Sequence, residues 1–110
     1  MEDIIHMTKT NLKANYIRIE NLYKSMFSEV KHTSIDLRDD KIEIMHLDEK
    51  NQDPAIIELS ETKIGYVVSY WDGYSLSETE ESDDILNALK IFKRYAKKMA
   101  KNLKKFSGHV

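Results

Sequence analysis

Residues 34–47 have the sequence SIDLRDDKIEIMHL, in which apolar side chains alternate with polar ones on both sides of Asp39–Asp40. An alternation of period two is typical of a strand with one buried face. Residues 55–71, AIIELSETKIGYVVSYW, repeat the pattern around Glu61–Thr62. The two stretches therefore predict two β-hairpins in one antiparallel sheet.

Two-residue turns at 39–40 and 61–62 would fix which residues face one another across these strands. The first turn sets Leu37 opposite Ile42, and the second sets Leu59 opposite Ile64. Opposed residues share a face of the sheet. The sequence thus predicts one continuous apolar face, made of Ile35, Leu37, Ile42, Ile44, Ile57, Leu59, Ile64, Tyr66, Val68 and Tyr70.

Helical periodicity flanks the sheet on both sides. Apolar residues recur every three or four positions over 9–31, which predicts an amphipathic helix after a flexible arm at 1–7. A longer helix is predicted over 83–106, with Ser82 as its N-cap. We therefore predict a single α+β domain, a two-layer sandwich. A four- to five-stranded antiparallel meander over 34–77 would carry both helices on one face.

Charge is sorted along the chain. Residues 36–84 hold 4 Lys/Arg and 15 Asp/Glu, a net charge of −11, whereas residues 85–110 hold 8 Lys/Arg and no acid. The total of −2 hides these two opposite fields. Such fields steer charged partners, so the sequence indicates either a charged partner or attraction between the two poles of one molecule.

The sheet face that the helices leave uncovered is predicted to place Asp36 opposite Glu43, a like-charge pair that usually weakens a sheet. Asp72–Gly73 predicts a type I′ turn, followed by a return strand at 74–77 that sets Trp71 opposite Tyr74. Acids beside exposed aromatic side chains are typical of a protein-binding surface. The predicted partner-binding residues are Asp36, Glu43, Glu58, Trp71, Tyr74, Glu78, Glu80 and Glu81.

Two structural interpretations of the same residues stay open. Trp71 and Tyr74 could form a cross-strand pair that only stabilises the hairpin, and the acids could be a solvated face balanced by neighbouring cations. The cations of the C-terminal helix form an alternative, nucleic-acid-binding surface made of Lys90, Arg94, Lys97, Lys101 and Lys105. No aromatic residue interleaves these cations, so base stacking is not indicated.

The sequence contains no catalytic motif. It has no Gly-rich phosphate loop, no H-E-x-x-H and no G-x-S-x-G. It has no cysteine, and its four histidines lack ligand spacing, so we predict a non-enzyme without cofactor or metal. No apolar run approaches the ~18 residues of a membrane span. The N-terminus lacks a signal-peptide pattern, so we expect a cytoplasmic protein.

The leading hypothesis is a small inhibitor that blocks a basic protein partner, for example a nuclease toxin domain, by occupying it. Bacterial immunity proteins and antitoxins are small acidic inhibitors of this type, and the analogy is one of size, charge and lack of catalytic groups. Two alternatives stay open. One is a nucleic-acid-binding accessory protein that uses the basic helix. The other is a homodimer or larger oligomer formed through the heptad-like stripe of that helix.

Overall fold

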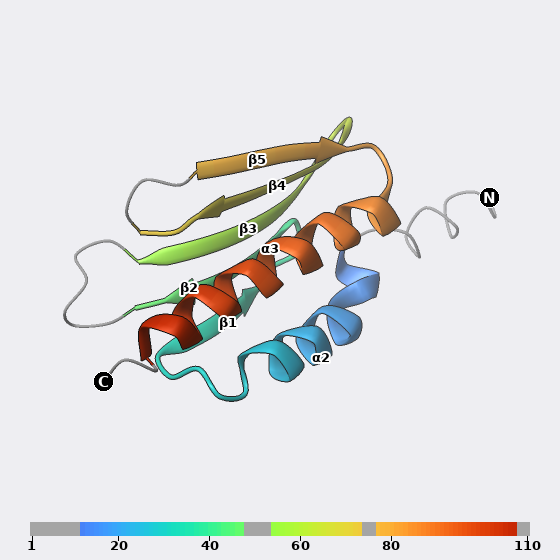
Figure 1. Ribbon diagram of the computed structural model, residues 1–110. Coiled ribbons are helices and arrows are strands. Elements are labelled where there is room, and N and C mark those ends of the chain that lie inside the picture. The colour runs from blue at the N-terminus through green and yellow to red at the C-terminus, as the bar shows by residue number, and fades with distance from the viewer. Residues whose placement is uncertain (1–11, 48–53, 74–76, 108–110) are drawn as a thin grey trace.

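The fold is a two-layer α+β sandwich, which confirms the predicted class (Figure 1). The computed structural model describes residues 12–47, 54–73 and 77–107, with side chains up to Lys104. The elements are η1 (Lys13–Asn15), α2 (Tyr16–Phe27), β1 (Thr33–Leu37), β2 (Lys41–His46), β3 (Ala55–Thr62), β4 (Gly65–Trp71), β5 (Ser77–Ser82) and α3 (Ile85–Ser107). The predicted arm at 1–7 lies outside the described residues.

The strands form a five-stranded antiparallel meander in the order β1-β2-β3-β4-β5. Figure 1 shows α2 and α3 side by side over one face of this sheet, with α2 next to β1 and α3 crossing the middle strands. Neither described helix covers the other face. The strands run from Thr33 to Ser82, past the predicted end at 77, because the last hairpin has a longer connection than its sequence predicts.

The core lies between the helices and the sheet face predicted to be apolar. The side chains of β2, β3 and β4 that face the helices are fully buried: Ile42, Ile44, Ile57, Leu59 and Val68. α3 covers them with Phe92, Tyr95 and Met99, which are also buried. Full burial of one such aliphatic side chain stabilises a fold by roughly 1.5–3 kcal/mol, so this face fixes how the two layers meet.

The second hairpin has a register different from the predicted one. Leu59 pairs with Val68 rather than with Ile64, and Thr62 pairs with Gly65. The turn therefore lies at 63–64 and not at 61–62. Because the shift spans an even number of positions, each strand keeps the same face toward the core. Ile64, predicted to be a core residue, instead lies in the turn and is 88% exposed.

Gly65 explains why the turn closes where it does. Its φ is 155°, in a region that L side chains rarely adopt. A Cβ at this position would lie only 2.6 Å from the carbonyl oxygen of Ser82 and 3.1 Å from the Cα of Asp83. Gly65 thus lets the β3–β4 turn approach the connection between β5 and α3, a contact between segments far apart in the sequence.

Gly65→Ala is expected to lower the free energy of unfolding by about 2 kcal/mol, because backbone strain and the approach to Ser82 act together. Urea denaturation followed by circular dichroism measures the change. Lys63→Ala, in the same turn but with an exposed side chain, is the control and should stay within about 0.5 kcal/mol of the wild type. Equal losses in the two variants would contradict the requirement for glycine.

The third hairpin also differs from its prediction. Trp71 pairs with Ser77 and not with Tyr74, so Asp72–Gly73 is not a two-residue type I′ turn. Gly73 does adopt a positive φ of 92°. Tyr74 and the rest of 74–76 lie outside the described residues. The predicted Trp71–Tyr74 cross-strand pair is therefore wrong, and the return strand is β5.

The two helices begin later than their patterns predict. α2 begins at Tyr16, after the single turn η1, and occupies only part of the range 9–31. The N-cap of α3 is Asp84 rather than Ser82, because the Asp84 Oδ2 accepts a hydrogen bond from the Asn87 N–H at 3.1 Å. A carboxylate at this position also suits the positive end of the helix dipole.

Burial raises the pKa of four tyrosines, and desolvation of the hydroxyl is the main cause in each: Tyr16, Tyr66, Tyr70 and Tyr95. A phenol with a higher pKa in the folded state holds its proton more tightly there than in the unfolded chain. Its contribution to stability is fully present below the unfolded pKa of about 10, and it is lost as the pH rises through the folded pKa.

The free energy of unfolding is therefore expected to fall above about pH 10, where the unfolded tyrosines ionise first. Urea midpoints measured across the alkaline range test this. Tyr70→Phe should make the fall less steep, because it removes one of the four phenols that the fold keeps protonated. A slope that is the same in Tyr70→Phe and in the wild type would contradict the assignment.

Candidate interaction surface on the sheet

The uncovered sheet face carries two adjacent cross-strand rows. The apolar row crosses β2, β3 and β4, and its members pair directly with one another: Met45, Ile56 and Trp71. The acidic row crosses β1, β2 and β3 in the same way: Asp36, Glu43 and Glu58. Members of both rows alternate along the strands with core residues, so the strand pattern that builds the core also builds this face.

Two cations compensate part of the acidic row. The Lys41 Nζ lies 3.0 Å from a Glu58 oxygen and 3.9 Å from a Glu43 oxygen. The hydrogen bond to Glu58, followed by the attraction of Glu58 and then of Glu43, raises the pKa of Lys41. Arg38 Nε donates to Asp36 Oδ2 at 2.8 Å. The predicted opposition of Asp36 and Glu43 is confirmed, and these two cations explain why the sheet tolerates it.

Lys41→Gln should lower the Tm by a few degrees at low salt, because it leaves Glu43 and Glu58 directly opposed without a cation between them. Added sodium chloride should recover much of the loss, since salt screens like-charge repulsion. Thermal unfolding at two ionic strengths checks both effects. Lys63→Gln removes the same charge at an exposed turn and should neither lower the Tm nor make it depend on salt. A loss of Tm in Lys41→Gln that salt does not reduce would contradict repulsion between Glu43 and Glu58 as the cause.

Trp71 is the only tryptophan of the chain, and it lies at the β4 end of the apolar row with its side chain half-buried. Its cross-strand neighbours are Ile56 and Ser77. The β5 residue opposite Trp71 is thus a serine and not an aromatic residue. A large aromatic side chain left partly open beside aliphatic residues is instead typical of the centre of an interface.

The acids of β5 lie on two different faces. Glu81 pairs with Val67 and belongs to the uncovered face. Glu78 and Glu80 pair with Tyr70 and Val68 and therefore point toward the helix layer. The sequence groups all three acids with the partner-binding residues, but the alternation along β5 separates them.

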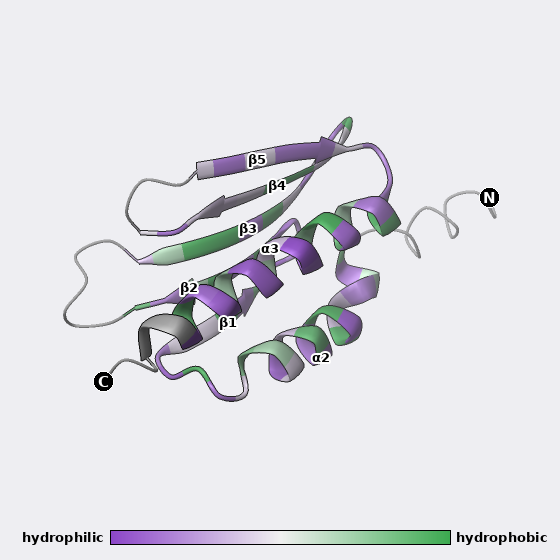
Figure 2. Cartoon of the chain, viewed as in Figure 1, coloured by the Kyte–Doolittle hydropathy of each residue, from purple (hydrophilic) through white to green (hydrophobic). Residues whose placement is uncertain are grey.

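Glu78 and Glu80 contact the cations of α3. The Glu80 carboxylate accepts hydrogen bonds from Arg94 and, at 2.8 Å, from the Tyr95 hydroxyl. Lys98 donates to Glu78. The acidic and basic poles of the sequence thus meet along the β5–α3 edge. Figure 2 shows the same edge as predominantly hydrophilic in β5 and on the outward side of α3.

Lys104 of α3 pairs with Glu29 at 3.8 Å, and the other described cations of α3 are exposed. Among the residues that the structure describes, Lys90, Lys93, Lys97 and Lys101 form no ion pair. Of the predicted nucleic-acid surface, Lys90, Lys97 and Lys101 are therefore open, Arg94 contacts Glu80, and the Lys105 side chain lies outside the described ones. Among the side chains of this predicted surface that the structure describes, Arg94 is the one that forms an ion pair within the molecule.

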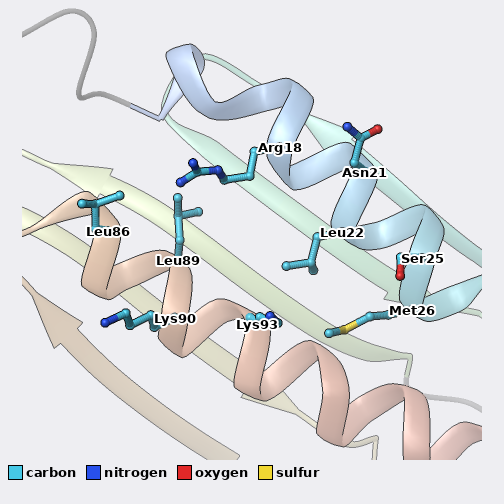
Figure 3. Close-up of a pocket in the computed structure, with 9 residues that line it drawn as sticks. All are labelled: Arg18, Asn21, Leu22, Ser25, Met26, Leu86, Leu89, Lys90 and Lys93. Atoms are coloured by element: carbon cyan, nitrogen blue, oxygen red, sulfur yellow. The ribbon is translucent and has the colours of Figure 1, made fainter.

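A groove with a volume of about 570 Å³ lies between α2 and α3 (Figure 3). Its lining combines apolar, polar and cationic side chains: Arg18, Asn21, Leu22, Ser25, Met26, Leu86, Leu89, Lys90 and Lys93. The sequence did not predict this groove, because the two helices that form it are separated in the chain by the whole sheet. The sequence did contain one signal for a surface here, a leucine at position 86 that lies outside the predicted apolar stripe. In the structure Leu86 is 56% exposed.

Comparison of the chain with protein-family models, with curated proteins and with solved structures gives no match. No described helix is both long and apolar enough to cross a membrane. Within 12–47, 54–73 and 77–107, no group of three or more His, Asp or Glu side chains is placed to hold a metal ion.

Proposed function

We propose that this protein is a small protein-binding module that occupies a basic partner with the uncovered face of its sheet. The observation that carries the proposal is the apolar row lying directly beside the acidic row. Protein interfaces combine an apolar, aromatic-rich centre with a polar rim. Here both parts are present on one rigid sheet, so binding would cost little conformational order.

In this proposal the two rows have different roles. Trp71 is the principal anchor, because burying a large, rigid aromatic side chain contributes more than most interface contacts. The acidic row attracts the partner. Asp36, Glu43 and Glu58 outnumber Arg38 and Lys41 by one charge, and Glu81 adds another on β5. Charge at the rim of an interface acts mainly on the rate of association.

The face is large enough for the centre of an ordinary interface. Five strands about 4.8 Å apart and roughly 20 Å long give a projected area on the order of 400 Å². A standard interface buries about 800 Å² on each partner. The partner would therefore extend past the sheet onto its edges.

The proposed mode of action is steric inhibition of a basic protein such as a nuclease toxin domain. It is supported by the small size of the chain, the acidic sheet face and the absence of a catalytic motif in the sequence. An inhibitor of this type, like an immunity protein or antitoxin, would act in the cytoplasm. Glu78 and Glu80 would serve indirectly, by holding α3 against β5, and Glu81 would contact the partner.

The test begins with capture of the partner from native lysate on the tagged protein, followed by stopped-flow association of the two purified proteins. The fluorescence of Trp71 reports binding at the proposed surface. Asp36→Lys/Glu58→Lys should slow association by about tenfold at low salt, and the difference should shrink as salt rises. Trp71→Ala, followed with an extrinsic label, should speed dissociation by about tenfold or more.

The matched control is Glu20→Lys/Glu29→Lys, which makes the same charge change on the helix side of the molecule. Its association rate should stay within about twofold of the wild type. Equal binding of the partner to the wild type, both sheet variants and the control would contradict binding through the sheet face. So would binding that only the control weakens.

A further inference from the structure

The groove between α2 and α3 has an apolar floor and a cationic rim. The half-buried floor consists of Leu22, Met26 and Leu89, the exposed rim consists of Arg18, Lys90 and Lys93, and Leu86 lies exposed at one end. In Figure 3, Leu22 and Met26 point from α2 toward α3, and Leu89 points back toward α2. No acidic side chain is among the described residues that line the groove. The three rim cations form no ion pair with a described residue.

The rim belongs to a longer cationic stripe on α3. At 100° per residue, Lys93 lies on the α2 side of the helix, and Arg94 and Lys98 lie on the β5 side. Lys97 and Lys101 lie between them and continue the line from Lys90. From Lys90 to Lys101 the stripe spans about 16 Å, or three helical turns. A ligand that satisfies the whole stripe must carry several negative charges spaced along an extended body.

We infer that this groove docks an acidic amphipathic helix of a partner protein. Such a helix presents apolar anchors at i, i+3, i+4 and i+7, which would enter between Leu22, Met26 and Leu89. Its flanking carboxylates would meet the rim cations and the stripe. The volume of about 570 Å³ falls within the roughly 300–1,000 Å³ of ordinary binding pockets.

The composition of the floor favours a helix over a nucleic acid. Phosphates would satisfy the rim, but a sugar–phosphate backbone would leave the apolar floor uncovered. An exposed leucine such as Leu86 gains free energy only from an apolar ligand. The inference is independent of the proposed function, because it uses the helix side of the molecule and a partner of the opposite charge.

The test uses a fluorescently labelled helical peptide of about 14 residues, four turns, with leucine at the anchor positions and glutamate elsewhere. Anisotropy should show saturable binding with a Kd on the order of 10–100 μM. A peptide of the same composition in scrambled order should bind at least about tenfold more weakly. Leu86→Asn, at an exposed position, should also weaken binding severalfold without unfolding the protein.

Arg18→Glu/Lys93→Glu should weaken peptide binding by at least about tenfold. Lys31→Glu/Lys63→Glu makes the same charge change away from the groove and should stay within about twofold. Circular dichroism checks folding, and Arg18→Gln/Lys93→Gln gives a milder version of the same test. Binding of a basic partner to the sheet should be the same in all these variants, so failure here and failure of the proposed function are separate results.

Three outcomes would overturn the inference. The first is no saturable peptide binding up to ~1 mM, or equal weakening in the groove and control variants. The second is a duplex of about 20 base pairs that binds more tightly than the peptide and is lost in Arg18→Glu/Lys93→Glu, which would assign the groove to nucleic acid. The third is a dimer in light scattering that Leu86→Asn dissociates, which would assign it to a second copy of the chain.

Discussion

One constraint shapes this molecule: a five-stranded sheet has two faces, and the described helices cover only one of them. Along each strand, residues at odd and even positions point to opposite faces. The covered face must therefore be apolar, and the uncovered face can take whatever side chains its use requires. The covered face is apolar because it carries the fully buried Ile42, Ile44 and Ile57. The acidic row and the apolar row occupy the second face, without disturbing the core.

The same alternation governs the edge strand β5. An edge strand leaves backbone groups unpaired, and charges that point inward from it discourage pairing with another chain. Glu78 and Glu80 are such charges. Arg94 and Glu80 are 59% and 40% exposed, so their ion pair contributes only on the order of 0–1 kcal/mol. Glu80 also accepts a hydrogen bond from the Tyr95 hydroxyl at 2.8 Å, so both of these contacts join β5 to α3 beside the buried core.

The parts of the fold that depend on local sequence could be predicted. The period-two alternation and the turn at Asp39–Asp40 correctly place Leu37 opposite Ile42. The second turn could not be located in this way, because residues 60–63 are all polar and both candidate turn positions keep the same strand residues on the apolar face. What decides it is the approach of Gly65 to Ser82, a contact between residues that only the tertiary structure brings together.

The position of the third hairpin, which carries part of the candidate site, could not be predicted from local sequence either. Asp72–Gly73 is a strong local signal for a two-residue turn, yet β5 begins only at Ser77. The observed register lets Glu78 and Glu80 reach Lys98 and Arg94 of α3. The sequence correctly placed Asp36, Glu43, Glu58 and Trp71 on the uncovered face. It could not separate Glu81 from Glu78 and Glu80, because that assignment depends on where β5 begins.

The sorted charge of the sequence becomes, in the fold, two surfaces of opposite sign on opposite sides of the molecule. Part of each pole is used internally where β5 meets α3, and the remainder faces solvent: acids on the sheet, and Lys90, Lys97 and Lys101 on α3. A helix is about 10–12 Å across, which exceeds the Debye length of about 8 Å at physiological salt. Each surface therefore presents its own field. Under the two proposals, a basic protein would be attracted to the sheet and repelled from α3, and an acidic helix would experience the reverse. Repulsion from the wrong face would add to the specificity that attraction to the right face provides, although the net charge of the chain is only −2.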